Sequence, residues 1–381
     1  MRDRTAPALT GPHAENPFSQ VTASRWNDWR WQYANRLTGQ GGLERLGWLS
    51  PGEKRALRPV LASFPWAATP YYLSLISPAD AADPIRRQVI PVPDERDDST
   101  PGSPDPLQEE SHTLAPGLIR RCPDRAVLLV TNRCGVYCRY CFRKRLWNGR
   151  PGLLNAAGVE AACACLSADS RIREVILSGG DPLTLPDSRL DRILGRLRRV
   201  PHLEVIRIGT RLPVVMPQRV TPDLCRLLDR HAPVWVVTQF NHPREITEEA
   251  AAACDRLLRA GVPVDNQTVL LRGVNDHPAT MASLCRGLLR IRVRPYYLHQ
   301  CDRVAGAEHF RTPLEKGMAI IREMQGKVSG LALPRFVVDL PGTGGKVSLQ
   351  PGAVLSQKDG QTRLRGNDGR TYCYADPAVR G

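Results

Sequence analysis

From about residue 125 onward, short apolar runs alternate along the chain with amphipathic segments. The runs are rich in β-branched residues, which is typical of strands buried on both faces of a sheet. Between them, apolar residues recur three and four positions apart and predict helices. The predicted strands are 126–131, 174–177, 205–209, 234–240, 262–270, 293–299 and 336–339. The predicted helices are 187–200, 222–230, 245–260, 279–291 and 313–325.

The alternation of strand and helix predicts an α/β fold with a parallel sheet. No GxGxxG or Walker motif follows a strand, so a full or partial (β/α) barrel is favoured over a dinucleotide-binding or P-loop fold. In such barrels the chemistry lies at the carboxyl ends of the strands. We expect an N-terminal helical region with a linker (1–115), a partial barrel (116–346) and a C-terminal tail (347–381) as an appendage. Residues 91–106, rich in Pro and Asp, are the expected linker or long surface loop.

Composition narrows the class of protein. The 381-residue chain carries 53 Lys and Arg against 38 Asp and Glu, a net charge of +15. This balance permits nucleic-acid binding, but the basic residues are spread as on a solvated surface, and no nucleic-acid-binding motif occurs. The sequence has no run of about 18 apolar residues and no apolar signal core, so we expect a cytoplasmic protein without a membrane span. Its 11 cysteines then suit metal ligation or burial better than disulfides.

Three cysteines follow the first predicted strand at the spacing C-x3-C-x2-C: Cys134, Cys138 and Cys141. Three thiolates in one loop can hold three irons of a [4Fe–4S] cluster and leave the fourth open to a small chelating ligand. A zinc site would need a fourth ligand at comparable spacing, which the sequence does not supply nearby. The loop also carries basic residues, which lower thiol pKa values and favour thiolate ligation: Arg139, Arg143, Lys144 and Arg145.

The triplet resembles the motif of the radical S-adenosylmethionine (SAM) superfamily, C-x3-C-x-aromatic-C, with Tyr140 at the aromatic position. This resemblance implies a partial barrel of the radical SAM type, a [4Fe–4S] cluster and bound SAM, with Tyr140 beside the adenine. The second predicted strand ends in SGGDP, which resembles the superfamily's glycine motif that meets the SAM amino group. The residues of that motif are Ser178, Gly179, Gly180 and Asp181.

Longer stretches, in the same order, are similar to the lysine 2,3-aminomutase family, which uses SAM, the cluster and pyridoxal phosphate (PLP). The similarity runs from residue 26 to residue 346. The matching stretches are DPIRRQVIP (83–91), PGLIRRCPDR (116–125), RIGTRLPVVMPQRVT (207–221), FNHPREIT (240–247), NQTVLLRGVND (266–276), RVRPYYLHQCD (292–302), EHFRTP (308–313) and FVVDLPGTGGK (336–346).

The family resemblance implies cofactor-binding roles for four residues. Lys346 ends a glycine-rich run after the last predicted strand, where a lysine amine can reach the PLP aldehyde, although a surface lysine on a turn would give the same string. Arg121 and Arg125 flank the start of the first strand and are implied to contact the PLP phosphate, a dianion that suits guanidinium groups. Gln267 is implied to be a further cofactor-binding residue.

Three further residues are implied to hold the substrate. Arg143 matches the arginine that receives the substrate α-carboxylate. Asp302 and Asp339 end predicted strands and should face one pocket, where two carboxylates repel each other unless a cation binds between them. They match the family's aspartate pair for the side-chain ammonium of lysine.

The implied activity is migration of the α-amino group of L-lysine to C3, which gives L-β-lysine. An aspartate pair would also bind a guanidinium group, so arginine 2,3-aminomutase stays an alternative. Two alternatives of other classes are a basic iron–sulfur or zinc module that binds nucleic acid, and a degenerate scaffold. The expected partners are the amino-acid substrate, a flavodoxin- or ferredoxin-type reductant and further copies of the chain.

The sequence departs from the family at several positions. His277 follows Asn275-Asp276, where the family has a zinc-binding cysteine, and the tail holds only Cys373, so we expect no structural zinc site. Gln239 stands where a histidine is usual and cannot titrate. Cys122 stands where an aromatic residue is common, so the surroundings of the PLP can differ.

Overall fold

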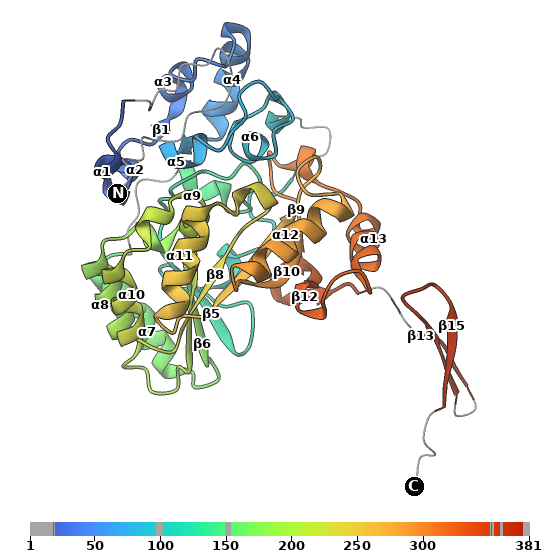
Figure 1. The fold of residues 1–381 in the computed structure, drawn as a ribbon. Coiled ribbons are helices and arrows are strands. Elements are labelled where there is room, and N and C mark those ends of the chain that lie inside the picture. The colour runs from blue at the N-terminus through green and yellow to red at the C-terminus, as the bar shows by residue number, and fades with distance from the viewer. Residues whose placement is uncertain are drawn as a thin grey trace.

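A 10-stranded sheet forms the centre of the computed structural model, in the order β12-β11-β10-β9-β8-β7-β6-β5-β4-β3 (Figure 1). The structure describes residues 18, 20–96, 102–148, 154–350, 352, 354–358 and 361–375. Strands β5 to β11 pair in parallel, and they overlap every strand predicted from the sequence. Among the described strands, β3 and β12 stay at the two edges, so the barrel is partial. The parallel strands are β5 (Arg125–Thr131), β6 (Glu174–Gly179), β7 (Val205–Gly209), β8 (Val234–Thr238), β9 (Val264–Leu270), β10 (Arg294–Gln300) and β11 (Arg335–Leu340).

Helices connect the parallel strands and cover the outside of the sheet (Figure 1). Local sequence sets their starts: in α10, Thr221 accepts a hydrogen bond from the N–H of Leu224, and Pro222 occupies the first turn. The apolar stripe of each helix faces the strands, as the spacing predicts. These helices are α7 (Ala156–Ala168), α8 (Asp187–Leu197), α10 (Pro222–Arg230), α11 (Glu248–Arg259), α12 (Pro278–Arg290) and α13 (Leu314–Met324).

The N-terminal region packs on one end of the barrel as short helices and a two-stranded pair (Figure 1). Its aromatic residues, Tyr72 among them, share one hydrophobic core with the barrel, so the predicted division of the chain at residue 115 stays a prediction. The elements are α1 (Ala23–Trp26), α2 (Trp29–Ala34), β1 (Leu37–Thr38), α3 (Gly39–Glu44), α4 (Pro51–Ser63), β2 (Ala67–Ala68), α5 (Pro70–Leu73) and α6 (Pro84–Val89).

The expectation that residues 91–106 form a linker or surface loop is wrong for their first part. The short 3-10 helix η1 (Pro93–Arg96) places Glu95 in the interior at 2% exposure. Glu95 binds the buried guanidinium of Arg139 through two N–O contacts of 2.8 and 2.6 Å. A buried carboxylate needs such a partner, and the partner lies in the cysteine loop, far along the sequence. Residues 97–101 lie outside the described part of the chain.

Short antiparallel strands complete the edges of the large sheet. β3 (Thr113–Ala115) and β4 (Leu118–Ile119) precede β5, and β12 (Gly345–Ser348) folds back on β11. The tail forms a separate sheet of β13 (Val354–Lys358), β14 (Gln361–Arg365) and β15 (Thr371–Ala375), which stands off the end of the barrel in Figure 1. Among the described residues, the helices are too short or too polar to cross a membrane.

Candidate active site

A cavity of about 420 Å³ lies inside the barrel, lined by residues from β5 round to β12. It brings together side chains that are up to 239 positions apart in the sequence, from Leu107 to Lys346. Eight of the residues predicted for the site line it, which places their functional groups around one space. They are Arg121, Arg125, Arg143, Ser178, Gln267, Asp302, Asp339 and Lys346.

Lys346 lies against the acidic wall of this cavity. Antiparallel pairing of β11 and β12 sets Asp339 directly opposite Lys346, so the two side chains leave the sheet on the same face. The Lys346 Nζ is 2.5 Å from Asp339 Oδ2 and 3.5 Å from His299 Nδ1. The same His299 nitrogen is 3.2 Å from Asp339 Oδ2. Asp339 therefore holds an alkyl ammonium group in this structure.

The two aspartates carry opposite pKa shifts. Burial works to raise the pKa of Asp339, but His299 and Lys346 outweigh it and hold that pKa well below its ordinary value. Asp302 gains no such partner, and burial, followed by the negative charge of Asp339, raises its pKa to about 7. Burial, together with the positive charge of Lys346, lowers the pKa of His299, so its imidazole is neutral. The acidic pair thus has room for one more positive charge.

Arg143 is already paired with the carboxylate of Glu109, which no sequence pattern predicts as its partner. Glu109 lies in the cavity wall and receives Arg143 Nε at 3.0 Å and Nη2 at 2.7 Å, while Arg145 Nη2 binds the same carboxylate at 2.9 Å. The remaining nitrogen of Arg143, Nη1, donates to Ser178 Oγ at 2.8 Å. Glu109 therefore fixes the plane of the Arg143 guanidinium and leaves Nη1 toward the cavity residue Ser178.

The two arginines at the start of β5 have different partners. Arg121 donates through Nε to the carbonyl of Gly342 at 2.8 Å and through Nη2 to the carbonyl of Leu340, which ties it to the loop that carries Lys346. Arg125 lies 3.2 Å from the side chain of its neighbour Asp124. Both line the cavity, so their positive charges face the same space as Lys346.

A second cavity, of about 220 Å³, lies on the other side of Arg143. Its wall includes the three cysteines of the loop after β5, together with the SGGDP turn after β6. The two cavities meet, because they share part of their lining. The shared residues are Phe142, Arg143, Ser178, Gly209, Val237, Gln239 and Gln267.

Comparison with known proteins decides the family. Residues 128–285 match the radical SAM superfamily, and residues 321–380 match the lysine 2,3-aminomutase family. The chain is 45% identical to the L-lysine 2,3-aminomutases of Acetoanaerobium sticklandii and Clostridium subterminale over 94% of its length, covering 87% and 86% of those proteins. The glutamate 2,3-aminomutase of Clostridioides difficile is 40% identical over the same share of the chain and 84% of its own.

The chain belongs to the lysine 2,3-aminomutase family. Membership brings the radical SAM partial barrel and three cofactors: a [4Fe–4S] cluster, SAM and PLP. The family also contains enzymes named for lysine and for glutamate, so membership alone leaves the substrate to the residues of the cavity.

The cysteine loop has the donor set that a cluster of this family requires. Cys134, Cys138 and Cys141 are free thiols in the wall of one cavity, and three sulfur ligands leave one iron open. Within the described residues, no three side chains of the metal-binding types converge as tightly as metal ligands do. Instead, Cys138 Sγ lies 2.9 Å from Arg211 Nη1.

Two basic residues of the loop, Arg143 and Lys144, lower the pKa of the Cys141 thiol as expected, but burial outweighs them. Arg139 and Lys144 are paired with Glu95, and Arg143 and Arg145 with Glu109, so their charges are largely balanced. Burial prevails and raises the pKa of the Cys141 thiol to about 11. The basic neighbours therefore act in the expected direction without setting the net shift, and a bound metal ion deprotonates its thiol ligands directly.

The SGGDP turn is built to dock on the cysteine loop. A Cβ on Gly179 or Gly180 would collide with the carbonyl of Thr131 or Arg133. The N–H groups of Gly180 and Asp181 donate to those carbonyls at 2.6 and 2.7 Å. The Asp181 carboxylate accepts from the Thr210 hydroxyl and from the Arg211 N–H, both at 2.7 Å. The turn thus holds the end of β7 beside the cysteines.

The predicted place of Tyr140 beside the adenine of SAM stays a prediction. Its ring packs edge-on against Phe310, with ring centroids 6.1 Å apart, and its hydroxyl accepts from Asn241 Nδ2 at 2.6 Å. Tyr140 is buried and lines neither of the two cavities. Gln239, one of the departures from the family, is among the residues that line both cavities.

The larger cavity suits PLP by its charges and by its free polar atoms. Arg121 and Arg125 supply cations for a phosphate, and Lys346 supplies an amine in the same cavity. His299 Nε2 is buried and finds no hydrogen-bond partner among the described residues, which leaves it available to a ligand. The departure Cys122 also lines this space.

Sequence reasoning missed three polar residues of this region: Glu109, His299 and Arg211. The sequence around two of them, His299 and Arg211, could have marked them as candidate site residues. His299 shares the inward face of its strand with Tyr297, and Arg211 follows directly after a predicted strand, where barrel chemistry gathers. Glu109 lies in a loop without periodicity, and its pairing with Arg143 depends on the fold.

Proposed function

We propose that this chain is a lysine 2,3-aminomutase that moves the α-amino group of L-lysine to C3 within the Lys346 cavity. One observation carries the proposal: Lys346, the acidic pair and Arg143 line a single cavity that shares a wall with the cysteine cavity. The 45% identity to L-lysine 2,3-aminomutases over 94% of the chain supports the same activity.

When bound, the reduced cluster and SAM supply a carbon-centred radical, and PLP carries the migrating amino group. The residues of the chain bind and orient the reactants around that chemistry. Lys346 holds PLP through its amine, while Arg121 and Arg125 bind the phosphate. Arg143 receives the substrate carboxylate through Nη1, because Glu109 occupies its other nitrogens. Fixing both ends of the substrate holds C3 in place.

The acidic pair selects a cationic side chain. Asp339 already holds the ammonium of Lys346 at 2.5 Å, which is the contact that the ε-ammonium of lysine would make. The pKa of Asp302 is raised by burial first and by the negative charge of Asp339 second, and a bound cation would oppose both effects. A glutamate side chain would add a third carboxylate. Of the remaining cationic substrates, lysine is favoured over arginine by the names of the most similar relatives.

Three further expectations belong to this proposal. A flavodoxin- or ferredoxin-type protein would supply the electron, since the cluster must be reduced. A cytoplasmic location suits free cysteines and an iron–sulfur cluster. Association of several copies is proposed as well, with tail contacts that differ from those of zinc-containing relatives, because His277 here caps helix α12 through Nδ1 and the N–H of Ala279.

The test is anaerobic incubation of the reconstituted protein with SAM, PLP, dithionite and, separately, L-lysine, L-arginine, L-glutamate and L-ornithine. We expect a β-amino acid from lysine, and none with the Lys346→Ala variant. A β-amino acid formed mainly from arginine would replace lysine as the substrate. No product from any of the four, with a fully loaded cluster, would refute the aminomutase activity. Salt-sensitive RNA affinity without PLP absorbance would instead favour the nucleic-acid-binding class.

A further inference from the structure

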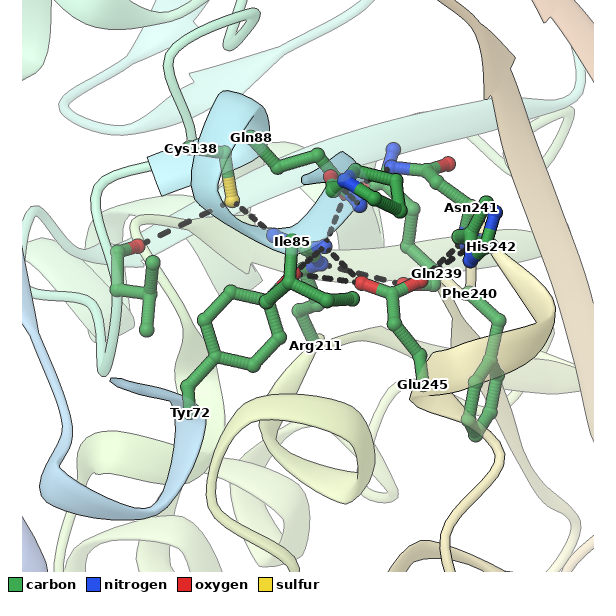
Figure 2. Close-up of polar contacts among 12 residues, drawn as sticks. Tyr72, Ile85, Gln88, Cys138, Arg211, Gln239, Phe240, Asn241, His242 and Glu245 are labelled. Atoms are coloured by element: carbon green, nitrogen blue, oxygen red, sulfur yellow. Dashed lines mark hydrogen bonds and ion pairs between the residues drawn. The ribbon is translucent and has the colours of Figure 1, made fainter. Parts of the chain in front are cut away.

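Arg211 lies at the centre of a buried polar network that touches a cluster cysteine (Figure 2). Its Nη2 contacts Glu245 Oε1 and Gln88 Oε1 at 2.6 Å each and the Tyr72 hydroxyl at 2.9 Å. Its Nε donates to the carbonyl of Gln239 at 3.2 Å, and Nη1 contacts Cys138 Sγ at 2.9 Å. Every nitrogen of the guanidinium therefore has a partner.

The network fixes the guanidinium from several independent segments. Tyr72 and Gln88 come from α5 and α6 of the N-terminal region, and Glu245 comes from the loop after β8. Tyr72 also donates to Glu245 Oε1 at 2.6 Å, and the Arg211 N–H is held by Asp181. Both the guanidinium and the Glu245 carboxylate are almost completely buried.

The charged groups of this network lie in a row, with the Arg211 guanidinium between the Glu245 carboxylate and the Cys138 sulfur. The Glu245 carboxylate binds the Nη2 side of Arg211, and the Cys138 sulfur lies on the Nη1 side. The pair is neutral overall, but its positive end faces the cysteine. In a buried setting such a fixed dipole acts strongly on a charge that appears beside it. Hydrogen bonds to cysteine sulfurs are among the factors that set the potential of iron–sulfur clusters.

We propose that Arg211 is a positioning residue that raises the reduction potential of the [4Fe–4S] cluster through its hydrogen bond to Cys138, and that Glu245 limits this effect. The inference rests on the proposed function, which places the cluster on Cys134, Cys138 and Cys141. One electron from the reductant adds one negative charge to the cluster and its thiolates. The Nη1–H group stabilises that added charge, and the carboxylate of Glu245 opposes it.

The two members of the pair therefore have opposite predicted effects. Arg211→Met removes the donor and the cation and leaves Glu245, so the midpoint potential should fall. Glu245→Gln leaves the cation with less compensation, so the potential should rise. Each change should alter the ratio of reduced to oxidised cluster at a fixed potential at least tenfold, which is about 59 mV for a one-electron couple. A role limited to folding would not give effects of opposite sign.

Arg219 is a matched control for loss of a buried arginine. It is buried and binds the carbonyls of Leu183 and Leu185 and the carboxylate of Asp187, and among the described residues it makes no hydrogen bond to Cys134, Cys138 or Cys141. The measurement is a redox titration of the reconstituted, SAM-free protein followed by electron paramagnetic resonance of the reduced cluster, with iron and sulfide counted per chain. Arg219→Met should leave the potential unchanged.

Opposite shifts for Arg211→Met and Glu245→Gln, with no shift for Arg219→Met, would support the proposal. Should Arg211→Met fail to fold, Arg211→Lys replaces it with an expected smaller fall, because one ammonium cannot reach both Glu245 and Cys138. Shifts of the same sign, or no shift in loaded protein, would overturn the role of Arg211 and leave the proposed function intact. Wild-type protein that holds no cluster would refute the proposed function, and this inference with it.

Discussion

Lys346 and Asp339 face each other across the antiparallel pair of β11 and β12, with Nζ and Oδ2 2.5 Å apart. Lys346, the residue proposed to hold PLP, thus binds the carboxylate of Asp339, which is proposed to hold the substrate side chain. Once the Lys346 amine is bonded to PLP, Asp339 is released to accept another ammonium. One carboxylate can therefore serve Lys346 and the substrate in turn.

Asp339→Asn should weaken lysine binding. Charge-assisted hydrogen bonds contribute about 1.5–3 kcal/mol, so the KM for lysine should rise about 10- to 100-fold. Steady-state formation of β-lysine under anaerobic conditions measures this change. Asp255→Asn is the matched control, because that aspartate pairs with Arg259 and Arg292 on the surface and should leave KM unchanged. An unchanged KM in Asp339→Asn would remove the residue from the substrate site.

Asp302 predicts a pH dependence of lysine binding. Its pKa is raised to about 7 by burial and by Asp339, with Lys346, Arg121 and Arg143 acting in the opposite direction. The carboxyl is therefore mostly protonated at pH 6 and ionised at pH 8. Lysine keeps its ε-ammonium charge throughout this range.

The KM for lysine should accordingly fall as the pH rises from 6 to 8, and Asp302→Asn should remove most of that dependence. His299 should contribute less to this profile than an ordinary histidine, because burial and the positive charge of Lys346 lower its pKa. An equally steep KM profile in Asp302→Asn would mean that another group titrates.

Two neighbouring arginines allow a matched test of the PLP site. Arg121 lines the cavity, whereas Arg120 turns to Asp169 at 2.5 Å and does not line it. Arg121→Gln should weaken PLP binding about 10- to 100-fold, since a charged contact to phosphate is lost, and Arg120→Gln should not. Titration of the apo-protein with PLP, followed by absorbance, gives both affinities. Equal affinities in the two variants would contradict the assignment.

Glu109 predicts a stability change at acidic pH. Despite burial, Arg143 and Arg145 lower its pKa from 4.5 to about 2. Because the folded-state pKa is depressed, ionised Glu109 stabilises the fold above pH 4.5, and this contribution is lost as the pH falls toward 2. The shift corresponds to about 3 kcal/mol of the free energy of unfolding.

Glu109→Gln should therefore lower the free energy of unfolding of the apo-protein at pH 7 by about that amount and flatten its decline in acid. Urea unfolding at pH 7 and at the lowest pH where the protein stays folded measures both effects. Glu110→Gln is the control, since that side chain is 77% exposed. Equal stabilities in the two variants would show that the Arg143–Glu109 pair contributes little.

The parallel strands of the fold could be predicted because each one carries its own signal. Buried strands such as β7 and β8 are short apolar runs bounded by turns, and the helices between them have one apolar face. Short antiparallel edges such as β12 have no such signal, since Gly345-Lys346-Val347-Ser348 is exposed and lacks an apolar run. Yet β12 sets the pairing of Lys346 with Asp339.

Site residues that belong to a sequence motif could be predicted. Residues that join the site only through contacts made in the folded chain could not. Spacing marks the three cysteines, and a strand end marks Asp302. The partners of the arginines depend on the folded chain, because Glu109 and Glu245 each lie 34 positions from the arginine that they bind, Arg143 and Arg211. Spacing also marks Tyr140, but it does not indicate the direction of the ring, which packs edge-on against Phe310 in the fold.

The most direct test of the central claim follows a hydrogen atom. The protein is incubated anaerobically with SAM, PLP, dithionite and L-lysine carrying deuterium at both C3 positions, and the products are analysed by mass spectrometry. Bound as proposed, with its two ends at Arg143 and the acidic pair, lysine should pass deuterium from C3 to 5′-deoxyadenosine and yield β-lysine with deuterium at C2. 5′-Deoxyadenosine that forms in amounts dependent on lysine but free of deuterium would contradict the account.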